Sequence, residues 1–305
     1  MYDPIFPKFK SLELADQNCI ETHSKKYPPY SDFDFSSLWA YNTRDLTELT
    51  WLNQNLVIKH ADYITGQPMF SFIGNNKPEE TVLTLLNFLR EKNLPEELSV
   101  IPEDSIKSLQ GQANLNFIIT EDLDQNDYII PLKESSEASN INPHKLKALE
   151  KFRLSYPSHN LIAIDLQDQK IQADIFYLFD YWASKRKRSN EDSYIERNAL
   201  KRMFDISHLI NISAFGLYIN NKIIGYIIDE YLRSPYVIGH FIKADTEYPG
   251  VYEFLNQETA RVHYAKGYKY INIEQDLGIE GLRISKMQRS PSFFLKKYRI
   301  SKKLS

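Results

Sequence analysis

The stretch Tyr270-Ile-Asn-Ile-Glu-Gln-Asp-Leu-Gly-Ile-Glu-Gly-Leu-Arg-Ile-Ser-Lys286 decides the fold prediction for this chain of 305 residues. Apolar residues at its start predict a buried strand, and the acidic residues Glu274 and Asp276 follow where that strand should end. Two glycines then predict a turn before a helix over residues 282–287. In α/β proteins, polar groups at the C-terminal end of a strand usually face a ligand crevice. The stretch therefore predicts a strand–turn–helix unit that carries a site, and the alternative interpretation is a surface turn with solvated charges.

The sequence around this stretch alternates strand and helix patterns in a defined order. The order is strand, two helices, three consecutive strands, helix, strand, helix and strand. Two of the consecutive strands are joined by Asn220-Asn221-Lys222, which is a strong hairpin signal. This order is typical of the GNAT acyltransferase fold. The strands are predicted over residues 161–166, 213–219, 223–231, 237–243, 268–273 and 293–298, and the helices over residues 171–184, 194–209, 251–266 and 282–287.

The first half of the chain gives a less complete pattern. Pro78 and the two glutamates after it predict the start of a helix, and apolar residues recur at helical spacing from Val82 to Leu89. Residues 121–127 predict an acidic, solvated loop. Short strands are predicted over residues 38–41, 56–60, 69–73, 98–101 and 115–120.

Four groups of motifs, in order along most of the chain, resemble one protein family. The first is Ser31-Asp-Phe-Asp-Phe-Ser-Ser-Leu-Trp39, and the second is Asp127-Tyr128 followed by a basic helix over residues 142–153. The third is Pro249-Gly-Val-Tyr-Glu-Phe-Leu-Asn256, a Pro-Gly turn with an asparagine on the next helix. The fourth is Glu274-Gln-Asp-Leu-Gly-Ile-Glu-Gly-Leu-Arg283, followed by Lys286, Pro291 and Lys297-Tyr298. Together they resemble the phosphatidylglycerol lysyltransferase C-terminal domain family, which is related to Fem-type aminoacyltransferases.

The resemblance implies an α/β (α+β) protein with two tandem GNAT-like acyltransferase domains, in which mixed sheets are flanked by helices. We expect an N-terminal GNAT-like domain over residues 1–140, a basic connecting helix over 141–157 and a C-terminal GNAT-like domain over 158–305. No sequence repeat is visible between the two halves, so the first of the two folds is expected from the resemblance. Characterised members of this family move an aminoacyl group from aminoacyl-tRNA to a lipid, which implies an aminoacyltransferase or acyltransferase.

The candidate catalytic residues are Glu274, Asp276, Arg283 and Lys286. Acyl transfer needs a base for the nucleophile, a group that stabilises the oxyanion, and an acid for the leaving hydroxyl. Asp276 or Glu274 could act as the base or hold the ammonium group of an aminoacyl donor. Arg283 could clamp a phosphate or the oxyanion, with Lys286 on nearly the same helix face. A structural ion pair between Arg283 and one of the two acids is the alternative.

The candidate substrate-binding residues come from three segments. Tyr252 and Asn256 are four residues apart on one predicted helix, so they could line the same crevice. The resemblance adds Asp32 and Trp39 from the N-terminal motif. A basic amphipathic helix can hold phosphates, and it can equally be an ordinary surface helix. Its cations are Lys145, Lys147, Lys151 and Arg153.

Composition excludes several other classes of protein. The net charge of −3 argues against binding a polyanion by bulk electrostatics, so RNA would need a local basic patch. The single cysteine excludes an internal disulfide framework, and the scattered histidines predict no metal site. Neither a serine-hydrolase elbow nor a phosphate loop is present. Because the sequence shows no apolar run of membrane-spanning length and no signal-peptide pattern, we expect a cytoplasmic location.

The loop Ala244-Asp-Thr-Glu-Tyr-Pro-Gly-Val251 bears on the choice of donor. An acetyl-CoA-dependent GNAT enzyme cradles pyrophosphate on backbone amides at this position. Asp245 and Glu247 would repel a pyrophosphate, and Pro249 removes an amide donor. We therefore expect no cofactor, with aminoacyl-tRNA rather than CoA as the donor. The family resemblance implies an anionic lipid at a membrane surface as a partner. The alternatives are an acyl-CoA-dependent GNAT N-acyltransferase and a non-catalytic anion-binding module, and the oligomeric state is not indicated.

Overall fold

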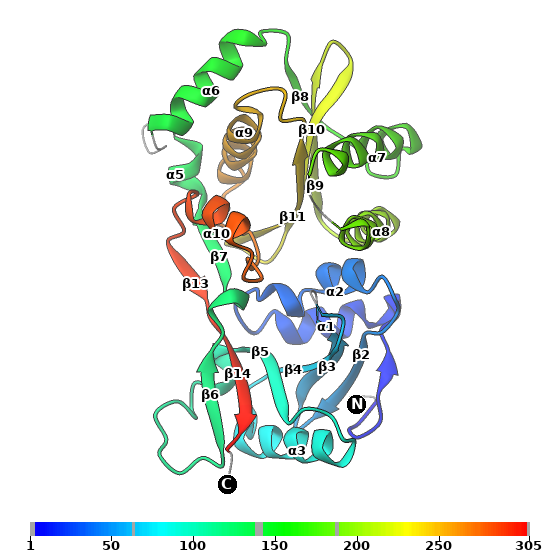
Figure 1. The fold of residues 1–305 in the computed structure, drawn as a ribbon, viewed down its shortest axis with the longest axis vertical. Helices are drawn as coiled ribbons and strands as arrows, with labels where there is room; N and C mark the ends of the chain where they lie inside the picture. The colour runs from blue at the N-terminus through cyan, green and yellow to red at the C-terminus, as the bar shows by residue number, and fades with distance from the viewer. Residues whose placement is uncertain (1–3, 63–64, 138–142, 187–188, 304–305) are drawn as a thin grey trace. The chain divides into compact units, whose positions relative to one another are not determined.

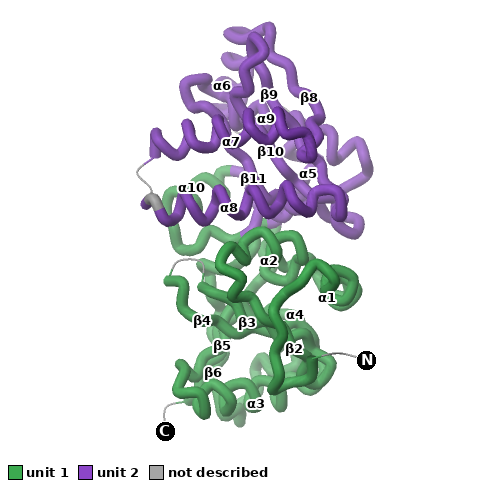
Figure 2. The backbone as a smooth tube through the Cα atoms, turned by 90° about the vertical axis from the view of Figure 1, so that its right-hand side faces the viewer, with its two compact units in different colours: residues 1–128, 275–288, 293–305 green, residues 129–274, 289–292 purple. Residues whose placement is uncertain are grey.

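The protein forms two compact units in the computed structural model, which describes residues 4–62, 65–137, 143–186 and 189–303 (Figure 1). Unit 1 consists of Met1–Tyr128, Gln275–Gln288 and Phe293–Ser305, and unit 2 of Ile129–Glu274 and Arg289–Ser292 (Figure 2). These units differ from the contiguous domains expected over residues 1–140, 141–157 and 158–305. The difference arises because the last strand of the chain pairs with strands from the first half.

Unit 1 contains two sheets of antiparallel strands. The first has the strand order β1-β2-β3-β4 and the second has the order β5-β14-β6. Strands β4 and β5 lie side by side without a backbone ladder, and the hydroxyl of Ser71 on β4 donates to the carbonyl oxygen of Val100 on β5 at 3.1 Å. The strands are β1 (Lys10–Ser11), β2 (Glu48–Leu52), β3 (Asn55–Ala61), β4 (Pro68–Ile73), β5 (Glu97–Pro102), β6 (Phe117–Glu121) and β14 (Lys297–Lys302).

Helix α3 (Pro78–Glu91) covers the core of unit 1, as its sequence predicts. Proline stands in its first turn, and Glu79 and Glu80 place negative charge at its N-terminus. Its apolar face packs into a cluster that also contains Phe72, Leu98 and Ile300 from three different strands. The other helices of unit 1 are α1 (Gln17–Ser24), α2 (Phe35–Tyr41), α4 (Glu103–Ile106) and α10 (Glu280–Met287), with short 3-10 turns η1 (Leu14–Asp16), η2 (Ser31–Phe33) and η3 (Leu123–Gln125).

Unit 2 is built on one long sheet with the strand order β7-β12-β11-β10-β9-β8. Its neighbouring strands run antiparallel, except that β11 and β12 are parallel. Asn220 and Asn221 both have positive φ, at 50° and 63°, which is the conformation of a two-residue hairpin turn and confirms the predicted hairpin. The strands are β7 (Asp127–Pro131), β8 (Asn160–Ala163), β9 (Ile212–Ile219), β10 (Lys222–Tyr231), β11 (Tyr236–Ala244) and β12 (Tyr270–Asn272).

Helices cover both faces of this sheet, with α9 on one face and α7 and α8 on the other (Figure 1). Helix α9 begins after Gly250, whose φ is +89°, and a Cβ there would lie 2.2 Å from the carbonyl oxygen of Ala148 on α6. Glycine therefore allows α6 and α9 to pack closely at this point. The helices are α5 (Leu132–Ser136), α6 (Pro143–Ser155), α7 (Gln169–Ser184), α8 (Asn190–Ile206) and α9 (Val251–Ala265).

The strand orders of the two units match position by position. Strands β1 to β5 correspond to β8 to β12, because α3 leads from β4 to β5 as α9 leads from β11 to β12. Strand β14 lies beside β5, and β7 lies beside β12 in the corresponding position. The outermost strands of the two orders are β6 and β13 (Phe293–Leu295). The strand beside β5 and the strand beside β12 thus both come from a distant part of the chain. The predicted fold class is confirmed, since both units are mixed α/β structures with sheets flanked by helices.

Three local predictions were wrong. Residues 38–41 belong to helix α2 and not to a strand, because Asp34 caps the helix by accepting from the backbone N–H of Ser37 at 3.1 Å. Residues 293–298 contain the whole of strand β13 (Phe293–Leu295) and the start of β14, which lie in different sheets. The acidic loop is not simply solvated, because its carboxylates form ion pairs in unit 1. These carboxylates are Glu121, Asp122, Asp124 and Asp127.

Among the helices of the described ranges, none combines the length and the apolar composition that crossing a bilayer requires.

Candidate active site

A buried histidine of unit 2, His240, lies between two glutamates at the point where strands β11 and β12 separate. The two strands pair only from Tyr236 to Ile238, with Ile238 opposite Asn272, and His240 and Glu274 each lie two residues beyond that last pair. His240 Nε2 lies 3.1 Å from Glu230 Oε2 on β10, and His240 Nδ1 lies 3.8 Å from Glu274 Oε1. The exposed fractions of the His240, Glu230 and Glu274 side chains are 0%, 8% and 19%. The edge of the cluster that solvent reaches is therefore on the Glu274 side.

The bond to Glu230 assigns the proton of the neutral imidazole. A carboxylate oxygen only accepts, so the 3.1 Å contact places the proton on Nε2 and leaves a lone pair on Nδ1. Nδ1 and the Glu274 carboxylate are then two acceptors 3.8 Å apart. An N–H or O–H donor can reach both, since hydrogen bonds to each need about 2.8–3.0 Å. A histidine oriented by a carboxylate in this way is suited to general acid–base chemistry.

The backbone at Glu274 fixes its position beside His240. Its φ is +59°, an uncommon conformation for a residue other than glycine, and its N–H donates to Asn272 Oδ1 at 2.7 Å. Strain of this kind persists only where the surroundings hold it, and it often occurs at functional sites. The irregularity between Ile228 and Asp229 in the β10–β11 pairing lies directly before Glu230.

A second carboxylate–histidine pair lies across the same sheet. Because neighbouring strand residues face opposite sides, Asp229 points away from Glu230 and towards α9. Its Oδ2 lies 2.8 Å from His263 Nε2, and the hydroxyl of Tyr231 lies 3.1 Å from His263 Nδ1. Burial lowers the pKa of Arg289 to about 10, and the nearby Asp229 opposes that decrease. This group of buried side chains ties α9 to the sheet.

The predicted residues Asp276 and Arg283 form a closed ion pair in unit 1. Arg283 donates from Nε to Asp276 Oδ2 and from Nη2 to Oδ1, both at 2.8 Å. Gly278 N–H also donates to Oδ1 at 2.8 Å, and the Tyr128 hydroxyl bonds Oδ2. Burial alone would raise the pKa of Asp276, but these bonds outweigh it and hold that pKa below its ordinary value. The pair clamps the turn before α10, and Asp124 adds a second carboxylate 2.5 Å from Arg283 Nη2.

Lys286 and Glu274 are placed in different surroundings. Lys286 Nζ donates to the carbonyl oxygen of Gln275 at 2.6 Å and lies 5.9 Å from the centre of the Tyr128 ring, all within unit 1. Of the four predicted catalytic residues, three thus stabilise one turn and Glu274 stands beside His240. Their catalytic roles stay predictions.

The predicted residue Asp32 belongs to a buried ion triad in unit 1. Lys297 Nζ bonds Asp32 and lies 2.7 Å from Asp127 Oδ1, and all three side chains are almost completely buried. Ser31 donates to Asp127 from both its N–H and its hydroxyl, at 2.8 and 2.6 Å. Burial would lower the pKa of Lys297, but the two carboxylates raise it overall, whereas burial raises the pKa of Asp127. Trp39, the other predicted residue of this segment, is half-buried on α2 and stacks on Phe35.

Helix α6 divides the predicted basic residues between two faces. Lys147 and Lys151 are exposed and four residues apart, so they share the solvent face. Arg153 turns towards α9, where its Nη2 donates to Gln257 at 2.9 Å and to Glu258 at 2.5 Å. Burial lowers the pKa of Lys145, and the charge of Glu253 partly offsets this effect. Two of the four cations are therefore committed to packing, and residue 142, where the helix was predicted to begin, lies outside the described residues.

The predicted pair on α9 is partly engaged within unit 2. The Tyr252 hydroxyl accepts from Ala244 N–H at 3.1 Å, and Asn256 Nδ2 donates to the Tyr252 carbonyl oxygen at 2.8 Å. Asn256 Oδ1 is buried and has no hydrogen-bond partner within the described part of the chain. This oxygen is the one atom of the pair left to accept a bond from a ligand or a water molecule.

The loop before α9 uses its own amides. Glu247 N–H donates to Asp245 Oδ1 at 3.0 Å, Tyr248 N–H to the Asp245 carbonyl at 3.1 Å, and Val251 N–H to the Tyr248 carbonyl at 3.1 Å. Asp245 itself is 2% exposed. A pyrophosphate would have to compete with these acceptors and with the buried carboxylate.

Glu230 and His240 were missed by the sequence reasoning. Both lie inside runs of apolar residues that read as buried strands, residues 222–231 and 236–244. The available signal was a charged or titratable residue inside each buried strand, since such residues are rarely buried without a partner.

The two mixed α/β units, whose sheets are flanked by helices, define the fold class, and a carboxylate-bound histidine lies where two parallel strands of unit 2 separate. A family model described as phosphatidylglycerol lysyltransferase, C-terminal, matches residues 25–301, and the chain therefore belongs to this family.

Solved structures show the same fold. A conserved protein of unknown function from Bacteroides thetaiotaomicron has a TM-score of 0.80 at 24% identity, with 99% of this chain and 100% of that chain covered. L-PGS from Bacillus licheniformis has a TM-score of 0.61 at 11% identity, covering 95% and 93%. The C-terminal domain of a putative lysylphosphatidylglycerol synthetase from Agrobacterium fabrum has a TM-score of 0.56 at 11% identity, covering 87% and 88%. The search of curated proteins found no match.

Proposed function

We propose that this protein transfers an aminoacyl group from aminoacyl-tRNA to an acceptor hydroxyl or amine, with phosphatidylglycerol as the first acceptor to test. The observation that carries the proposal is the position of His240 between Glu230 and Glu274 in a member of this family. A base with this orientation is what ester aminolysis or transesterification needs.

In the proposed reaction, His240 Nδ1 removes the proton from the acceptor as the acceptor oxygen or nitrogen attacks the ester carbonyl carbon. The bond between that carbon and the ribose oxygen then breaks, and the imidazolium returns the proton to the leaving ribose hydroxyl. Glu230 holds Nε2–H and stabilises the imidazolium while it exists. Glu274 accepts a hydrogen bond from the acceptor or from the ammonium group of the donor. No redox partner or cofactor is required, since one ester is exchanged for another ester or an amide.

Two observations favour an aminoacyl ester over acyl-CoA as the donor. The backbone N–H groups of the loop before α9 already donate to Asp245 and Tyr248. They would have to break these hydrogen bonds to bind a pyrophosphate. Lys147 and Lys151 are exposed on one face of α6, with the exposed Glu150 between them in the sequence, although the whole chain carries −3. These two lysines can contact an RNA backbone by point charges. Anionic lipid at a membrane surface is the proposed source of the acceptor.

The test is a transfer assay with the full-length chain. Aminoacyl-tRNA charged with labelled amino acids is mixed with vesicles that contain phosphatidylglycerol, and label is followed in the RNA and lipid fractions. We expect label to move to lipid in the presence of the protein. His240→Asn should lower the rate at least about 100-fold, the lower end of the general-base contribution, and Glu230→Gln should lower it in the same direction.

The matched control is His208→Asn, because His208 is an exposed histidine of the same unit. Its rate and the unfolding midpoints of all three variants should stay close to those of the parent. Full activity of His240→Asn would refute the assigned base. If label moves from RNA to a soluble amine and not to lipid, aminoacyl transfer stands as the reaction and the amine replaces phosphatidylglycerol as the acceptor. Turnover with acyl-CoA and none with aminoacyl-tRNA would refute the assignment of aminoacyl-tRNA as the donor.

A further inference from the structure

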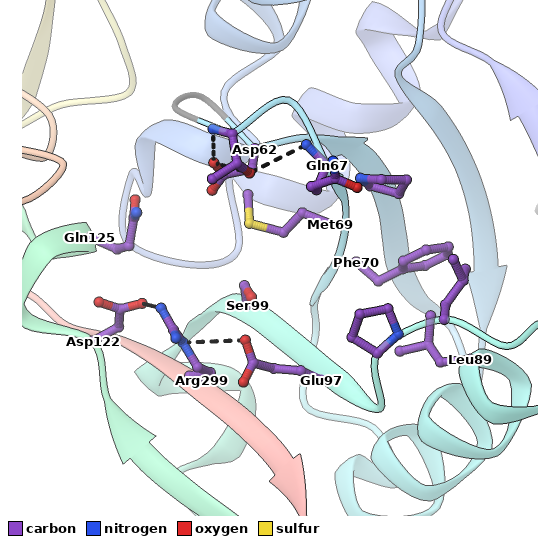
Figure 3. A pocket seen from close by; sticks show the side chains of 14 residues that line it. Asp62, Gln67, Met69, Phe70, Leu89, Glu97, Ser99, Asp122, Gln125 and Arg299 are labelled. Carbon is purple, nitrogen blue, oxygen red and sulfur yellow. Dashed lines mark hydrogen bonds and ion pairs between the residues drawn. The ribbon is translucent and has the colours of Figure 1, made fainter.

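Unit 1 contains a cavity of about 290 Å³, whereas His240 belongs to unit 2 (Figure 3). Its apolar wall includes Met69 and Phe70 from β4 and Leu89 from α3. Its polar wall includes Glu97 from β5 and Arg299 from β14. At about 30 Å³ per water-sized volume, the space suits a ligand of roughly ten heavy atoms. Small-molecule sites combine an apolar wall with polar groups that orient the ligand, and this cavity has both, with polar side chains in the majority.

The cavity exists because β4 and β5 are neighbours that do not pair. Their backbones belong to different sheets, so the ladder that would close the space is missing. The β5–β14 pairing is irregular between Tyr298 and Ile300, at Arg299. On β5, Val100 has a φ of +49°, which is a strained conformation for a β-branched residue, and the residue before it, Ser99, lines the cavity. Strain of this kind is often retained beside ligand sites.

The polar wall carries more negative than positive charge. Three carboxylates, Asp62, Glu97 and Asp122, line the cavity with a single cation, Arg299. Arg299 is held in place by Asp122 at 2.9 Å and by Glu97 at 3.4 Å (Figure 3). Within the described ranges, this salt bridge is the one direct polar contact of the Glu97 carboxylate, and burial raises the pKa of that carboxyl. The Glu97 carboxylate therefore has acceptor capacity left over after Arg299 is paired, whereas Asp62 already accepts from the N–H and the hydroxyl of Thr65.

Gln125 supplies an independent sign of a missing donor. Its Oε1 atom is buried and has no hydrogen-bond partner among the residues that the structure describes, and the side chain lines the same cavity. A buried amide oxygen without a partner costs about 1–3 kcal/mol unless a water molecule or a ligand donates to it. This oxygen has almost no accessible surface, so the acidic wall is the part of the cavity that calls for a ligand with N–H donors.

We propose that the cavity binds a small organic ammonium ion, whose apolar body packs against Met69, Phe70 and Leu89 and whose charged nitrogen is held by the acidic wall around Glu97. The apolar wall selects against simple ions such as ammonium or potassium, because these gain nothing from burial of apolar surface. The acidic wall selects against carboxylates and phosphates of the same size. This site belongs to unit 1 alone and does not depend on the reaction proposed for His240.

The experiment compares two ligands of equal shape. Isothermal titration and saturation-transfer NMR of the full-length chain use 2-phenylethylammonium as the probe and neutral 2-phenylethanol as its isostere. We expect the ammonium to bind at least about tenfold more tightly than the alcohol, since a hydrogen bond to a charged group contributes more than one to a neutral group. Glu97→Gln keeps the shape of the side chain and removes its charge, and it should weaken ammonium binding at least about tenfold.

Glu91→Gln is the matched control, because Glu91 is an exposed glutamate on α3 outside the cavity wall. It should bind the ammonium like the parent chain. A third variant, Met69→Trp, fills the space and should abolish binding of both probes. The proposal is overturned if the alcohol binds as well as the ammonium, if Glu97→Gln binds like the parent, or if no ammonium binding is seen at millimolar concentration while the chain stays folded.

Discussion

Replacing Lys297 by methionine should destabilise unit 1 severely. The ammonium group has no exposed surface and lies between Asp32 and Asp127, so its removal leaves two buried carboxylates without their cation. Breaking a buried ion pair by removing one partner costs about 3–5 kcal/mol, and a shared cation places the loss at the upper end. Urea unfolding followed by tryptophan fluorescence measures it. In a Trp182→Phe background the remaining tryptophans, Trp39 and Trp51, both report on unit 1.

The neighbouring Lys296 provides the control for this prediction. Its side chain is 43% exposed and pairs with Glu121 at 3.0 Å, so Lys296→Met should cost no more than about 1 kcal/mol. The pH dependence adds a second check. Burial raises the pKa of Asp127, so in Lys297→Met the folded state should bind more protons than the unfolded state, and stability should recover as the pH falls towards about 4. Equal losses for the two lysine variants, or a deficit that grows on acidification, would refute the reasoning.

Two further predictions concern backbone conformation and the clamped turn. Gly250→Ala should cost about 1–3 kcal/mol from backbone strain alone, and more from the clash with α6, when unfolding of unit 2 is followed by Trp182 fluorescence. Gly267→Ala is its control in the same unit: the φ of Gly267 is +90°, but a Cβ there meets no atom within 4 Å, so this variant should lose only the strain energy and not the clash. Asp276→Asn should cost about 1.5–3 kcal/mol by urea unfolding at pH 7, since it removes the charge that Arg283 binds. Because folding lowers the pKa of Asp276, this difference should be complete above about pH 4 and should shrink below it, and a difference that persists at pH 2 would contradict the assignment.

Local patterns predicted most of the elements of unit 2 because each is decided within its own segment. The hairpin at Asn220, the helix after Gly250 and the strand–turn–helix at Tyr270 all depend on turn residues and periodicity. The strand prediction for residues 38–41 was wrong because this segment alone does not decide its structure. A run of four apolar residues fits a strand or a helix, and the deciding signal was the cap at Asp34.

The candidate site was less predictable than the fold. Asp276 and Arg283 have the composition of a catalytic pair, but their bidentate geometry and the bond from Gly278 are those of a structural clamp. His240 and Glu230 have no local motif, and only the pairing of β10 with β11 brings them to 3.1 Å. The spacing of two residues in the sequence does not predict such a distance, because strand register is set by the whole sheet.

The acidic and basic clusters of the chain show the same limit in electrostatic form. Read separately, residues 121–127 are an acidic loop and residues 296–302 are a basic tail. In unit 1 they are partners, because β14 lies between β5 and β6 and places Lys296 beside Glu121 and Arg299 beside Asp122. Charges that look like a polyanion-binding tail are thus largely neutralised by a segment about 170 residues earlier in the chain. A charge cluster in a sequence is therefore evidence for an external ligand only after its partner inside the fold has been sought, and the exposed Lys147 and Lys151 on α6 meet that condition better than the C-terminal lysines do.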